Sequence, residues 1–408
     1  MVMKPMKALI SLEEGLRILL ECASPITRTE QVGLLDATGR ILAEAVVAAM
    51  DVPPFPRASM DGYAVIAEDT FGAGNFNPVR LQLVEVVHAA EIAQHTVGRG
   101  SCIQVATGSP IPAGADAVVQ VEDTELEGEA EEAGKIKVYK PVYPRQNVSP
   151  QAEDIRTGRE VLPAGTRLDP SKIGVLAALG FTQIPVIAKP TVAVIPSGNE
   201  IVRPGDPLAP GKIYDINSYT LSALIQEHGG APVQFPIMQD TLQDVQKSLA
   251  EALVCDLVVI SGGSSVGERD VMLEAVESLG EIKFHGIAVK PGKPTLCGVV
   301  QGKLILGMPG YPTSCLTNGY GLLIPVLRKL AHLPETKTEG VELPMSRRYT
   351  STIGRYQYLP VRVEKDEVVP VFKESGAITS MADAEGYIEI PANVDLVEKG
   401  ERVLVKFF

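Results

Sequence analysis

The fold of this chain is decided by the stretch Asp256-Leu-Val-Val-Ile-Ser-Gly-Gly-Ser-Ser-Val-Gly-Glu-Arg-Asp270. Leu257 to Ile260 are consecutive apolar residues, as expected of a short strand buried on both faces. The glycines that follow allow the backbone to turn its N–H groups toward an anion, and a helix is predicted to begin at Asp270. Because ligands of open α/β sheets lie at the carboxyl ends of the strands, we expect a phosphate group here. The alternative is a tight connection that binds nothing.

The sequence on both sides of this stretch alternates between predicted strands and helices. We predict strands at residues 191–195, 232–237, 257–260 and 304–306, and helices at residues 218–228, 241–253, 271–279 and 312–330. This alternation predicts a doubly wound, mostly parallel sheet.

The rest of the chain predicts three further parts, so that the whole is a multidomain α/β protein. The predicted parts are an extended mixed domain of residues 1–55 with 141–187, a β-rich inserted domain of 56–140, the α/β domain of 188–332, and a small C-terminal β-barrel of 333–408. The acidic stretch from Glu122 to Glu132 is predicted to be a solvated hairpin loop.

Composition excludes several classes of protein. The 408 residues carry a formal net charge of −13, which argues against nucleic acid and against an anionic membrane surface as partners. The five cysteines are scattered without a C-x-x-C pair, which favours free thiols in a reducing cytoplasm. The start of the chain has the capping box Ser11-Leu-Glu-Glu14 and a stripe of leucines, so it predicts a helix and not a signal peptide. No apolar run is long enough to span a membrane.

Polar loops follow the predicted strands of the α/β part. They are Pro196 to Glu200, Asp240, Gly262 to Asp270, and Gly307 to Ser314. In the last of these, Pro312 can take the first helical position and leave free amides facing a ligand. Just before it, Lys290 and Lys293 stand on a stiff Pro/Gly loop, which suits the binding of an anion.

Each acid in these loops also has a purely structural interpretation. Three predicted helices of this part each have a residue that could cap them: Asp240 or Thr241 for one helix, Asp270 for another, and Asn217 or Ser218 for the third. Taken together with Asp215, however, they surround one edge of the sheet with carboxylates, lysines and amides. Carboxylates beside a phosphate site usually need a divalent cation, and Mg²⁺ is the natural candidate.

Three further segments outside this part have the same two interpretations. Asp61 lies between Met60 and Gly62 after a proline-rich stretch, and it is either a turn residue or an active-site acid. Thr107-Gly-Ser-Pro110 is a turn that could offer a hydroxyl group and amides, and Asp154 lies in a polar connection that could be only a solvated loop.

These segments, taken in order, resemble one family. They are Pro54-Phe-Pro-Arg-Ala-Ser-Met-Asp-Gly-Tyr-Ala64, Thr107-Gly-Ser-Pro, Ala152-Glu-Asp-Ile155, Ser261-Gly-Gly-Ser-Ser-Val-Gly267, Lys290-Pro-Gly-Lys-Pro294 and Met308-Pro-Gly-Tyr-Pro312. The chain resembles the molybdopterin molybdenumtransferases, the family that includes the gephyrin E domain. The resemblance covers essentially the whole length. It implies an elongated cytoplasmic homodimer that inserts molybdate into adenylated molybdopterin with Mg²⁺ and releases AMP.

The resemblance also implies roles for residues of this sequence. The residues expected to be catalytic are Asp61, Thr107, Asp154, Glu200, Asp270 and Lys290. The residues expected to bind the substrate are Asp215, Asn217, Gly262, Gly263, Ser265, Lys293, Pro309, Pro312 and Ser375. The residues expected to bind the metal are Asp240, Asp270 and Glu200. Three residues depart from the common pattern of the family: His285 stands where a lysine is frequent, Asn199 where an aspartate is common, and Tyr311 where an asparagine is frequent.

The mechanism expected from these roles is cleavage of the phosphoanhydride of the substrate. The sheet edge would hold the phosphates, Mg²⁺ would neutralise their charge, and Asp61 and Asp154 would align the anhydride or activate water. Three alternatives stay open: a molybdopterin adenylyltransferase acting one step earlier, a tungstate-preferring form of the same insertion step, and a scaffold that binds a peptide through its C-terminal domain. The adenylyltransferase of the same pathway is a possible partner.

Overall fold

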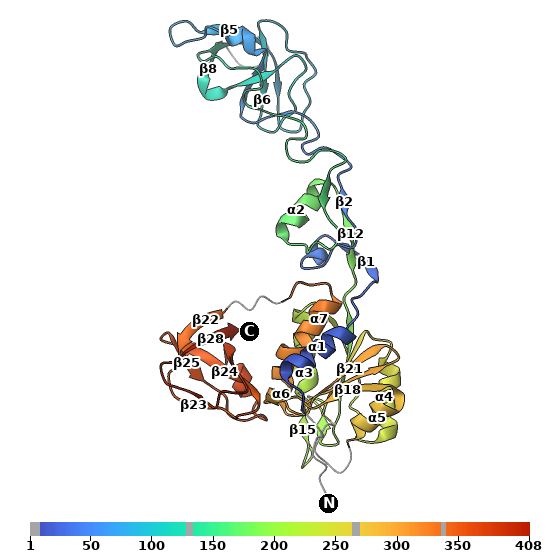
Figure 1. Cartoon of the computed structure of the whole chain (residues 1–408). Helices are drawn as coiled ribbons and strands as arrows, with labels where there is room; N and C mark the ends of the chain where they lie inside the picture. The colour runs from blue at the N-terminus through green and yellow to red at the C-terminus, as the bar shows by residue number, and fades with distance from the viewer. Residues whose placement is uncertain (1–8, 128–133, 263–269, 336–339) are drawn as a thin grey trace, which may run out of the picture. The chain divides into compact units, whose positions relative to one another are not determined.

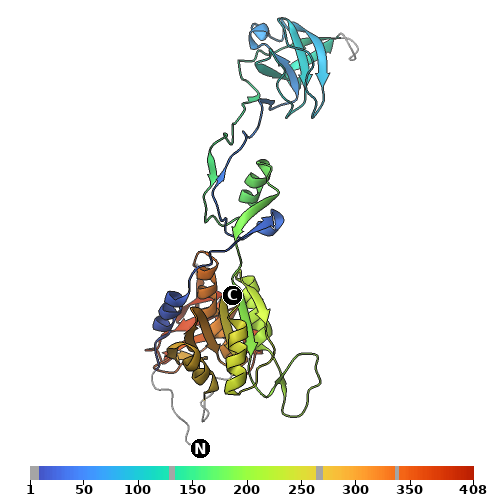
Figure 2. The ribbon, with the colours of Figure 1, turned by 90° about the vertical axis from the view of Figure 1, so that its right-hand side faces the viewer.

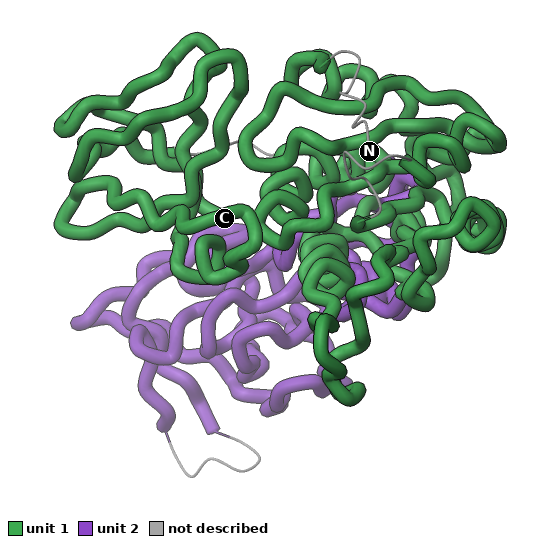
Figure 3. Tube along the Cα trace, turned by 90° about the horizontal axis from the view of Figure 1, so that it is seen from below, with its two compact units in different colours: residues 1–31, 39–41, 185–408 green, residues 32–38, 42–184 purple. Residues whose placement is uncertain are grey.

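The computed structural model describes residues 9–127, 134–262, 270–335 and 340–408. The chain divides into two compact units, which Figure 3 shows in different colours: residues 1–31, 39–41 and 185–408 form unit 1, and residues 32–38 and 42–184 form unit 2. The finer division into four domains stays a prediction.

Unit 1 is built around a six-stranded sheet. Its strands, in spatial order, are β16 (Ala231–Gln234), β13 (Thr191–Pro196), β17 (Leu257–Ser261), β21 (Lys303–Met308), β20 (Leu296–Val300) and β18 (Glu281–His285). The first four are parallel to one another, and β20 runs antiparallel to both of its neighbours, β21 and β18. The sheet is therefore mostly parallel, as predicted, but the strand β20, which runs opposite to the other five, was not expected from the sequence.

Helices cover both faces of this sheet (Figures 1 and 2). One face packs against α1 (Leu12–Cys22), α3 (Asn217–Glu227) and α7 (Ile324–Leu330), and the other against α4 (Leu242–Ala252) and α5 (Val271–Leu279). Successive strand residues point to opposite faces, so Leu257 and Val259 join the first core while Val258 and Ile260 join the second. This double coverage explains why the strands read as unbroken apolar runs.

The helix predicted at residues 312–330 is interrupted. It consists of α6 (Pro312–Asn318), a π-helical turn labelled η4 (Gly319–Leu323), and α7. Pro325, in the first turn of α7, cannot donate a hydrogen bond to the preceding turn and would clash with its carbonyl, and the wider π turn accommodates this. The two glycines of η4 allow close packing, because an added Cβ would lie 2.6 Å from Leu224 at Gly319 and 2.6 Å from the Tyr358 hydroxyl at Gly321.

Helix starts agree with the prediction except in two details. Ser11 Oγ accepts a hydrogen bond from the amide of Glu14, but the Glu14 carboxylate bonds to Arg17 and does not complete the capping box. For α3, the prediction that Asn217 or Ser218 is the cap is wrong: Asp215 Oδ1 accepts from the Ser218 amide at 3.1 Å.

The C-terminal part of unit 1 is a curled sheet. Its order is β19 (Val289–Lys290), β24 (Tyr356–Glu364), β26 (Gly386–Ile390), β28 (Arg402–Phe407) and β22 (Gly340–Pro344), with β25 (Glu367–Pro370) paired to β24. A bridge between Met345 and Val368 brings the end of β22 back to β25. The short strands β23 (Tyr349–Thr350) and β27 (Leu396–Val397) pair separately, and α8 (Thr379–Ala382) precedes β26. The strand β19 is a segment of the α/β part, so its Lys290 is held by the C-terminal sheet.

Unit 2 contains a second six-stranded sheet. Its order is β7 (Ala117–Gln120), β4 (Gly62–Val65), β6 (Ser101–Val105), β5 (Val79–Val87), β9 (Lys135–Val138) and β8 (Thr124–Glu127). The shorter elements are η2 (Ala67–Thr70), the strand pairs β3 (Arg57–Ala58) with β10 (Val148–Ser149) and β2 (Val46–Val47) with β11 (Glu160–Leu162), and helix α2 (Pro170–Ala178). A further pair joins β1 (Thr29–Gly33) to β12 (Gln183–Ile187).

The acidic stretch from Glu122 to Glu132 is not wholly a loop, and that prediction is wrong for its first part. Thr124–Glu127 is a strand that pairs antiparallel with β9, and Lys137 of β9 forms ion pairs with both Glu125 and Glu127. Residues 128–132 lie outside the described residues. In the part of the chain that is described, no helix is both long and apolar enough to cross a membrane.

Candidate functional site

The register of the central sheet defines its carboxyl edge. Ile195, Ile260, Gly307, Leu296 and His285 form one row across five strands. The loops that leave this row contain most of the residues predicted for the site in unit 1. The edge is therefore the place where an open α/β sheet would bind a ligand.

The turn after β17 comes very close to the neighbouring loop. Gly262 has φ +93°, and a Cβ there would lie 2.2 Å from the Ser197 carbonyl oxygen, so only glycine fits. Its amide donates to Met308 at 3.2 Å, so the anion-binding amides expected in this turn do not include that of Gly262. Gly263 and Ser265 lie outside the described residues.

Asp240 is bound to the first loop of this edge. Its Oδ1 accepts a hydrogen bond from Ser197 Oγ at 2.5 Å, and Met238 forms a bridge with Ser197. The helix cap of α4 is Thr241, whose hydroxyl accepts from the Asp244 amide at 3.2 Å. Asp240 is thus free of the capping role that was its structural alternative.

Glu200 is exposed and lies beside a strained glycine. Gly198 has φ +149°, and a Cβ there would lie 2.8 Å from Glu200 Oε1. The Glu200 carbonyl accepts from the Ile213 amide at 2.9 Å, where β14 (Ile201–Val202) pairs with β15 (Ile213–Tyr214). This small ribbon joins the Glu200 loop to Asp215, the residue after β15.

Asp270 has a structural role and a second contact. Its Oδ1 caps α5 by accepting from the Leu273 amide at 3.0 Å. Its Oδ2 lies 3.0 Å from His285 Nε2, although the two groups are not aligned as a hydrogen bond. The side chains are 13% and 19% exposed respectively, so the second contact is largely shielded from water.

Asp215, Asn217 and Ser218 form a buried polar group at the start of α3. Asn217 Nδ2 donates to the Gly310 carbonyl at 2.9 Å, which holds the loop after β21. Asn217 Oδ1 and Ser218 Oγ are buried without a hydrogen-bond partner in the described structure. These atoms could accept or donate hydrogen bonds to a bound molecule or to water.

The loop after β21 leads into α6. Pro312 occupies the first turn, as predicted, and Pro309 precedes Gly310 in the loop. The expectation of free amides there is wrong for Thr313, whose N–H donates to the Ser375 carbonyl at 3.0 Å. Ser375 therefore contacts the site loop through its backbone.

Of the two lysines of the predicted anion loop, Lys290 ends β19 and Lys293 follows it in the loop. Lys290 Nζ donates to Thr352 Oγ1 at 2.9 Å, and this ammonium group is partly buried. An ammonium group has three N–H donors, so the bond to Thr352 leaves others for a ligand. The Lys293 carbonyl accepts from the amides of Ile287 and Thr295, both at 3.0 Å, which fixes the backbone beside the second lysine.

The predicted metal ligands Asp240, Asp270 and Glu200 were tested as a group. Among the described residues, no three His, Cys, Asp or Glu side chains lie in an arrangement that could hold a metal ion. The donors fit Mg²⁺ in kind, since they are carboxylate oxygens, but not in number. Mg²⁺ usually binds one or two carboxylates together with substrate phosphates, so the edge fits the ion only when substrate is present.

In unit 2, Asp61 and Thr107 are joined directly. Asp61 Oδ1 accepts from the Thr107 amide at 2.7 Å and from its hydroxyl at 2.9 Å. These bonds lower the pKa of Asp61 below its ordinary value, so the exposed side chain is a carboxylate at neutral pH. Gly62 is required next to it, because a Cβ there would lie 1.9 Å from the Val119 carbonyl oxygen. Ser109 Oγ, two residues after Thr107, is buried without a partner in the described structure.

Asp154 is exposed on a loop that Asp51 holds in place. The Asp154 amide donates to the Val52 carbonyl at 3.0 Å. Asp51 accepts from the amide and hydroxyl of Thr157, both at 2.8 Å, and from Gln151 at 2.7 Å. Asp51 lies in no sequence motif, and its position before Pro53-Pro54 gives no local indication of a partner 106 residues away.

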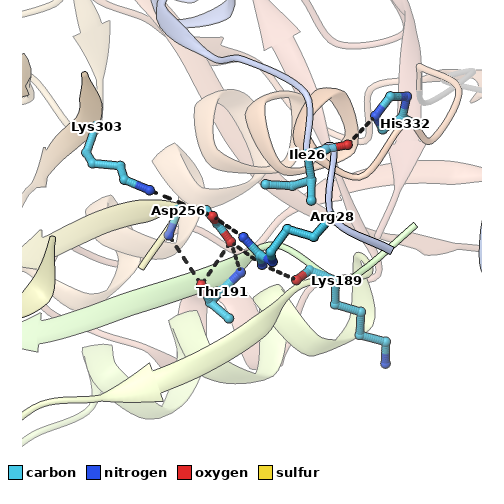
Figure 4. Close-up of polar contacts among 7 residues, drawn as sticks. All are labelled: Ile26, Arg28, Lys189, Thr191, Asp256, Lys303 and His332. Carbon is cyan, nitrogen blue, oxygen red and sulfur yellow. Dashed lines mark hydrogen bonds and ion pairs between the residues drawn. The ribbon is translucent and has the colours of Figure 1, made fainter. Parts of the chain in front are cut away.

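The opposite, amino edge of the central sheet has a different polar cluster (Figure 4). Asp256 accepts two hydrogen bonds from Arg28, at 2.6 and 2.8 Å, and two from the amide and hydroxyl of Thr191, at 2.8 and 2.9 Å. Lys303 Nζ lies 3.9 Å away. Burial raises the pKa of Asp256, but the bonds from Arg28 and Thr191 outweigh it, and the net pKa lies below the ordinary value.

Comparison with known proteins identifies the family. Three family models match in order: the MoeA N-terminal region (domain I and II) at residues 10–180, a probable molybdopterin binding domain at 193–329, and the MoeA C-terminal region (domain IV) at 342–408. The chain is 32% identical to the molybdopterin molybdenumtransferase of Bacillus subtilis, covering 92% of this chain and 89% of the relative. The chain belongs to the MoeA family of molybdopterin molybdenumtransferases.

Two further comparisons agree. A protein of Methanocaldococcus jannaschii named a putative molybdopterin biosynthesis protein is 34% identical, over 98% of both chains. A crystal structure of a molybdopterin biosynthesis MoeA protein from Pyrococcus horikoshii has a TM-score of 0.80 and 33% identity, covering 98% of this chain and all of that one. The family resemblance and the transferase class predicted from the sequence motifs are thereby confirmed, as is the mixed α/β fold.

Proposed function

We propose that this protein inserts molybdate into adenylated molybdopterin and releases AMP, which yields the molybdenum cofactor. The proposal rests on its membership of the MoeA family and on one observation in particular. Among the described residues, two buried side-chain atoms without a hydrogen-bond partner, Asn217 Oδ1 and Ser218 Oγ, lie together at the start of α3, on the carboxyl edge of the central sheet. Another such atom, Ser109 Oγ, lies two residues after Thr107.

Unpaired buried polar atoms support a ligand site because folding alone does not favour them. Leaving such an atom without a hydrogen bond costs roughly 1–3 kcal/mol. A polar group retained at this cost is expected where a bound molecule or an ordered water completes its hydrogen bonds. Their gathering at the edge where α/β sheets bind ligands favours substrate binding over a purely structural role.

The proposed roles of the residues follow from their charges. Lys290 and Lys293 would attract the oxyanions, namely the phosphates and molybdate, and the Asp215 and Asn217 group would hold the polar parts of the substrate. When bound with the substrate, Mg²⁺ would supply positive charge to the phosphoryl oxygens, with one or two of Asp240, Asp270 and Glu200 as its protein ligands.

Asp61 is proposed to act on the water that cleaves the phosphoanhydride. Its lowered pKa makes it a carboxylate, so it can orient or accept a proton from water but cannot donate one. Both of its hydrogen bonds within the described structure fall on Oδ1, which leaves Oδ2 for that water. Asp154, on the loop held by Asp51, is proposed to serve the same step.

The proposed reaction is tested by incubating the purified protein with adenylated molybdopterin, Mg²⁺ and molybdate. We expect AMP release to accompany the appearance of molybdenum-loaded pterin, with one AMP for each metal inserted. The same protein given ATP and molybdopterin should form no adenylated product, whereas an adenylyltransferase would. Absence of AMP release from the adenylated substrate would contradict the proposal.

The identity of the metal and the assembly are parts of the same proposal. An equimolar mixture of molybdate and tungstate, followed by metal analysis of the product, would show which oxyanion is preferred. We propose a homodimer in the cytoplasm that receives its substrate from the adenylyltransferase of the pathway. Sedimentation of the protein alone and mixed with that enzyme tests both interactions.

A further inference from the structure

The loop of residues 290–295, which carries Lys290 and Lys293, is held by a residue that no motif identifies. Asn318, the last residue of α6, is 1% exposed. Its Nδ2 donates to the Gly292 carbonyl at 2.9 Å and to Thr295 Oγ1 at 2.7 Å. Thr295 Oγ1 donates in turn to the same Gly292 carbonyl at 2.8 Å. The middle of the loop is therefore closed by a ring of three hydrogen bonds.

The contact between Asn318 and the loop also explains the glycine between the two lysines. Gly292 has φ +115°, a conformation that other residues rarely adopt. A Cβ at this position would lie 2.3 Å from Asn318 Oδ1 and 2.6 Å from Asn318 Nδ2. The glycine lets the backbone approach the amide group closely enough for these hydrogen bonds to form.

Stability alone does not account for an asparagine at this position. Its Oδ1 is buried and has no partner within the described residues, so the amide satisfies only its donor side. An apolar side chain of similar size would leave no such atom unpaired. Rotating the amide by 180° would turn Oδ1 toward the Gly292 carbonyl, where two acceptors would face each other, so the hydrogen-bond network fixes the orientation.

Helix α6 connects this loop to two other parts of the site. At its first turn, the Thr313 amide and hydroxyl donate to the carbonyls of Ser375 and Ala377, at 3.0 and 2.8 Å. The loop that enters the helix is held by Asn217 through the Gly310 carbonyl. Helix α6 thus bonds to the lysine loop at its last residue and to the segment of Ser375 at its first turn, and it begins directly after the loop that follows β21.

We propose that Asn318 is a positioning residue, which holds the backbone of the 290–295 loop so that Lys290 and Lys293 face a bound oxyanion. This inference rests on the proposed function, because it assigns that oxyanion to the substrates named above. Asn318 acts through the loop and makes no contact with substrate itself. Its loss should therefore weaken anion binding without removing the positive charges.

The test compares Asn318→Leu with Thr317→Val on the same helix. Leucine is of similar size but has no donor. Thr317 is also buried, and within the described residues its hydroxyl makes only a 3.8 Å contact with Met381 Sδ. Binding of molybdate and of AMP is measured by titration calorimetry at several salt concentrations. Because the loop would no longer hold the two ammonium groups toward the anion, we expect affinity about tenfold weaker for Asn318→Leu, with a shallower salt dependence, and affinity within about twofold of wild type for Thr317→Val.

Two results would overturn the inference: unchanged affinity and salt dependence in Asn318→Leu, or an equal loss in both variants. If Asn318→Leu does not fold, Gly292→Ala replaces it, with Gly302→Ala as its control. Gly302 has φ +76° and open space around it, so the control also places an alanine at positive φ, away from the loop. The inference then requires the affinity loss only in Gly292→Ala, and equal affinities would overturn it. Because binding is measured without turnover, failure of the proposed reaction would be seen separately, in the AMP-release assay of the wild-type protein.

Discussion

The two edges of the central sheet differ in how completely their polar groups are paired. At the amino edge, Asp256 accepts four side-chain and backbone hydrogen bonds from Arg28 and Thr191. At the carboxyl edge, the Asn217 amide oxygen and the Ser218 hydroxyl are buried without a partner in the described structure. Because the same strands supply both edges, the difference does not come from the fold. The amino edge is built for stability, and the carboxyl edge retains polar groups that a ligand can complete.

Unit 2 repeats this contrast with two aspartates. Asp51 accepts hydrogen bonds on both of its carboxylate oxygens, whereas the bonds to Asp61 fall on Oδ1. If incomplete pairing marks function, the two kinds of carboxylate should respond differently to mutation. The experiments below are ordered from the largest expected effect to the smallest.

The largest effect is expected for Asp61→Asn. The substitution keeps the size of the side chain but removes the negative charge that would orient or deprotonate water, so turnover should fall roughly 10²–10⁴-fold. AMP release from adenylated molybdopterin measures this. The control is Asp116→Asn, because Asp116 accepts a bond from the Ala67 amide at 2.7 Å and has no predicted role in the reaction. Turnover of Asp61→Asn above about a tenth of wild type would reject a chemical role.

Asp256→Ala should have the opposite effect to Asp61→Asn: we expect a large loss of folding stability and no loss of activity. Removing the carboxylate leaves the Arg28 and Thr191 donors without their acceptor. We expect a loss of about 2–3 kcal/mol, which is less than for a fully buried ion pair because Arg28 is half-exposed. Urea unfolding measures the loss. Reduced turnover per folded molecule in this variant would contradict the assignment of the amino edge to stability alone.

A lysine at each edge gives the next comparison. Lys290→Ala should weaken the binding of AMP or molybdate about tenfold, with a shallower dependence on salt, because one cation of the carboxyl edge is lost. Lys303→Ala, beside Asp256 at the amino edge, should bind both anions as the wild type does. Titration calorimetry at low and moderate salt measures both. Equal affinities in the two variants would mean that Lys290 does not face the anion.

The smallest expected effect is a change in folding stability at acid pH. The folded state lowers the pKa of Asp256, so its contribution to stability is complete above the pKa of the unfolded chain, near 3.9, and is lost as the pH falls through the lower folded value. The difference in urea midpoint between wild type and Asp256→Asn should therefore be constant from pH 7 to about pH 5 and shrink below about pH 4. A difference in urea midpoint that grows as the pH falls would contradict a lowered pKa of Asp256 in the folded state.

Elements governed by local sequence were predictable. The buried strands at residues 191–195 and 257–260 follow from their apolar runs, and the helix starts at Thr241 and Asp270 follow from their capping side chains. The strand β20 was missed because Gly298 interrupts its apolar pattern. That glycine is required by packing, since a Cβ there would lie 2.4 Å from Val276 of α5.

The residues of the site that the sequence did not reveal depend on distant partners. Asn318 bonds to Gly292, 26 residues earlier, and Asp51 bonds to Thr157, 106 residues later. Neither lies in a motif or at the end of a predicted strand. Residues such as Asp61, Lys290 and Asp270 could be predicted because glycines and prolines mark the loops around them.

The most direct test of the account is to locate molybdenum itself. Crystals grown with molybdate and AMP, measured at the molybdenum absorption edge, give an anomalous signal from the metal alone. The account predicts a peak at the carboxyl edge of the central sheet, within reach of the Lys290 and Lys293 side chains. A peak at the Arg28 and Lys303 cluster of the amino edge, or none in a protein that binds molybdate in solution, would contradict it.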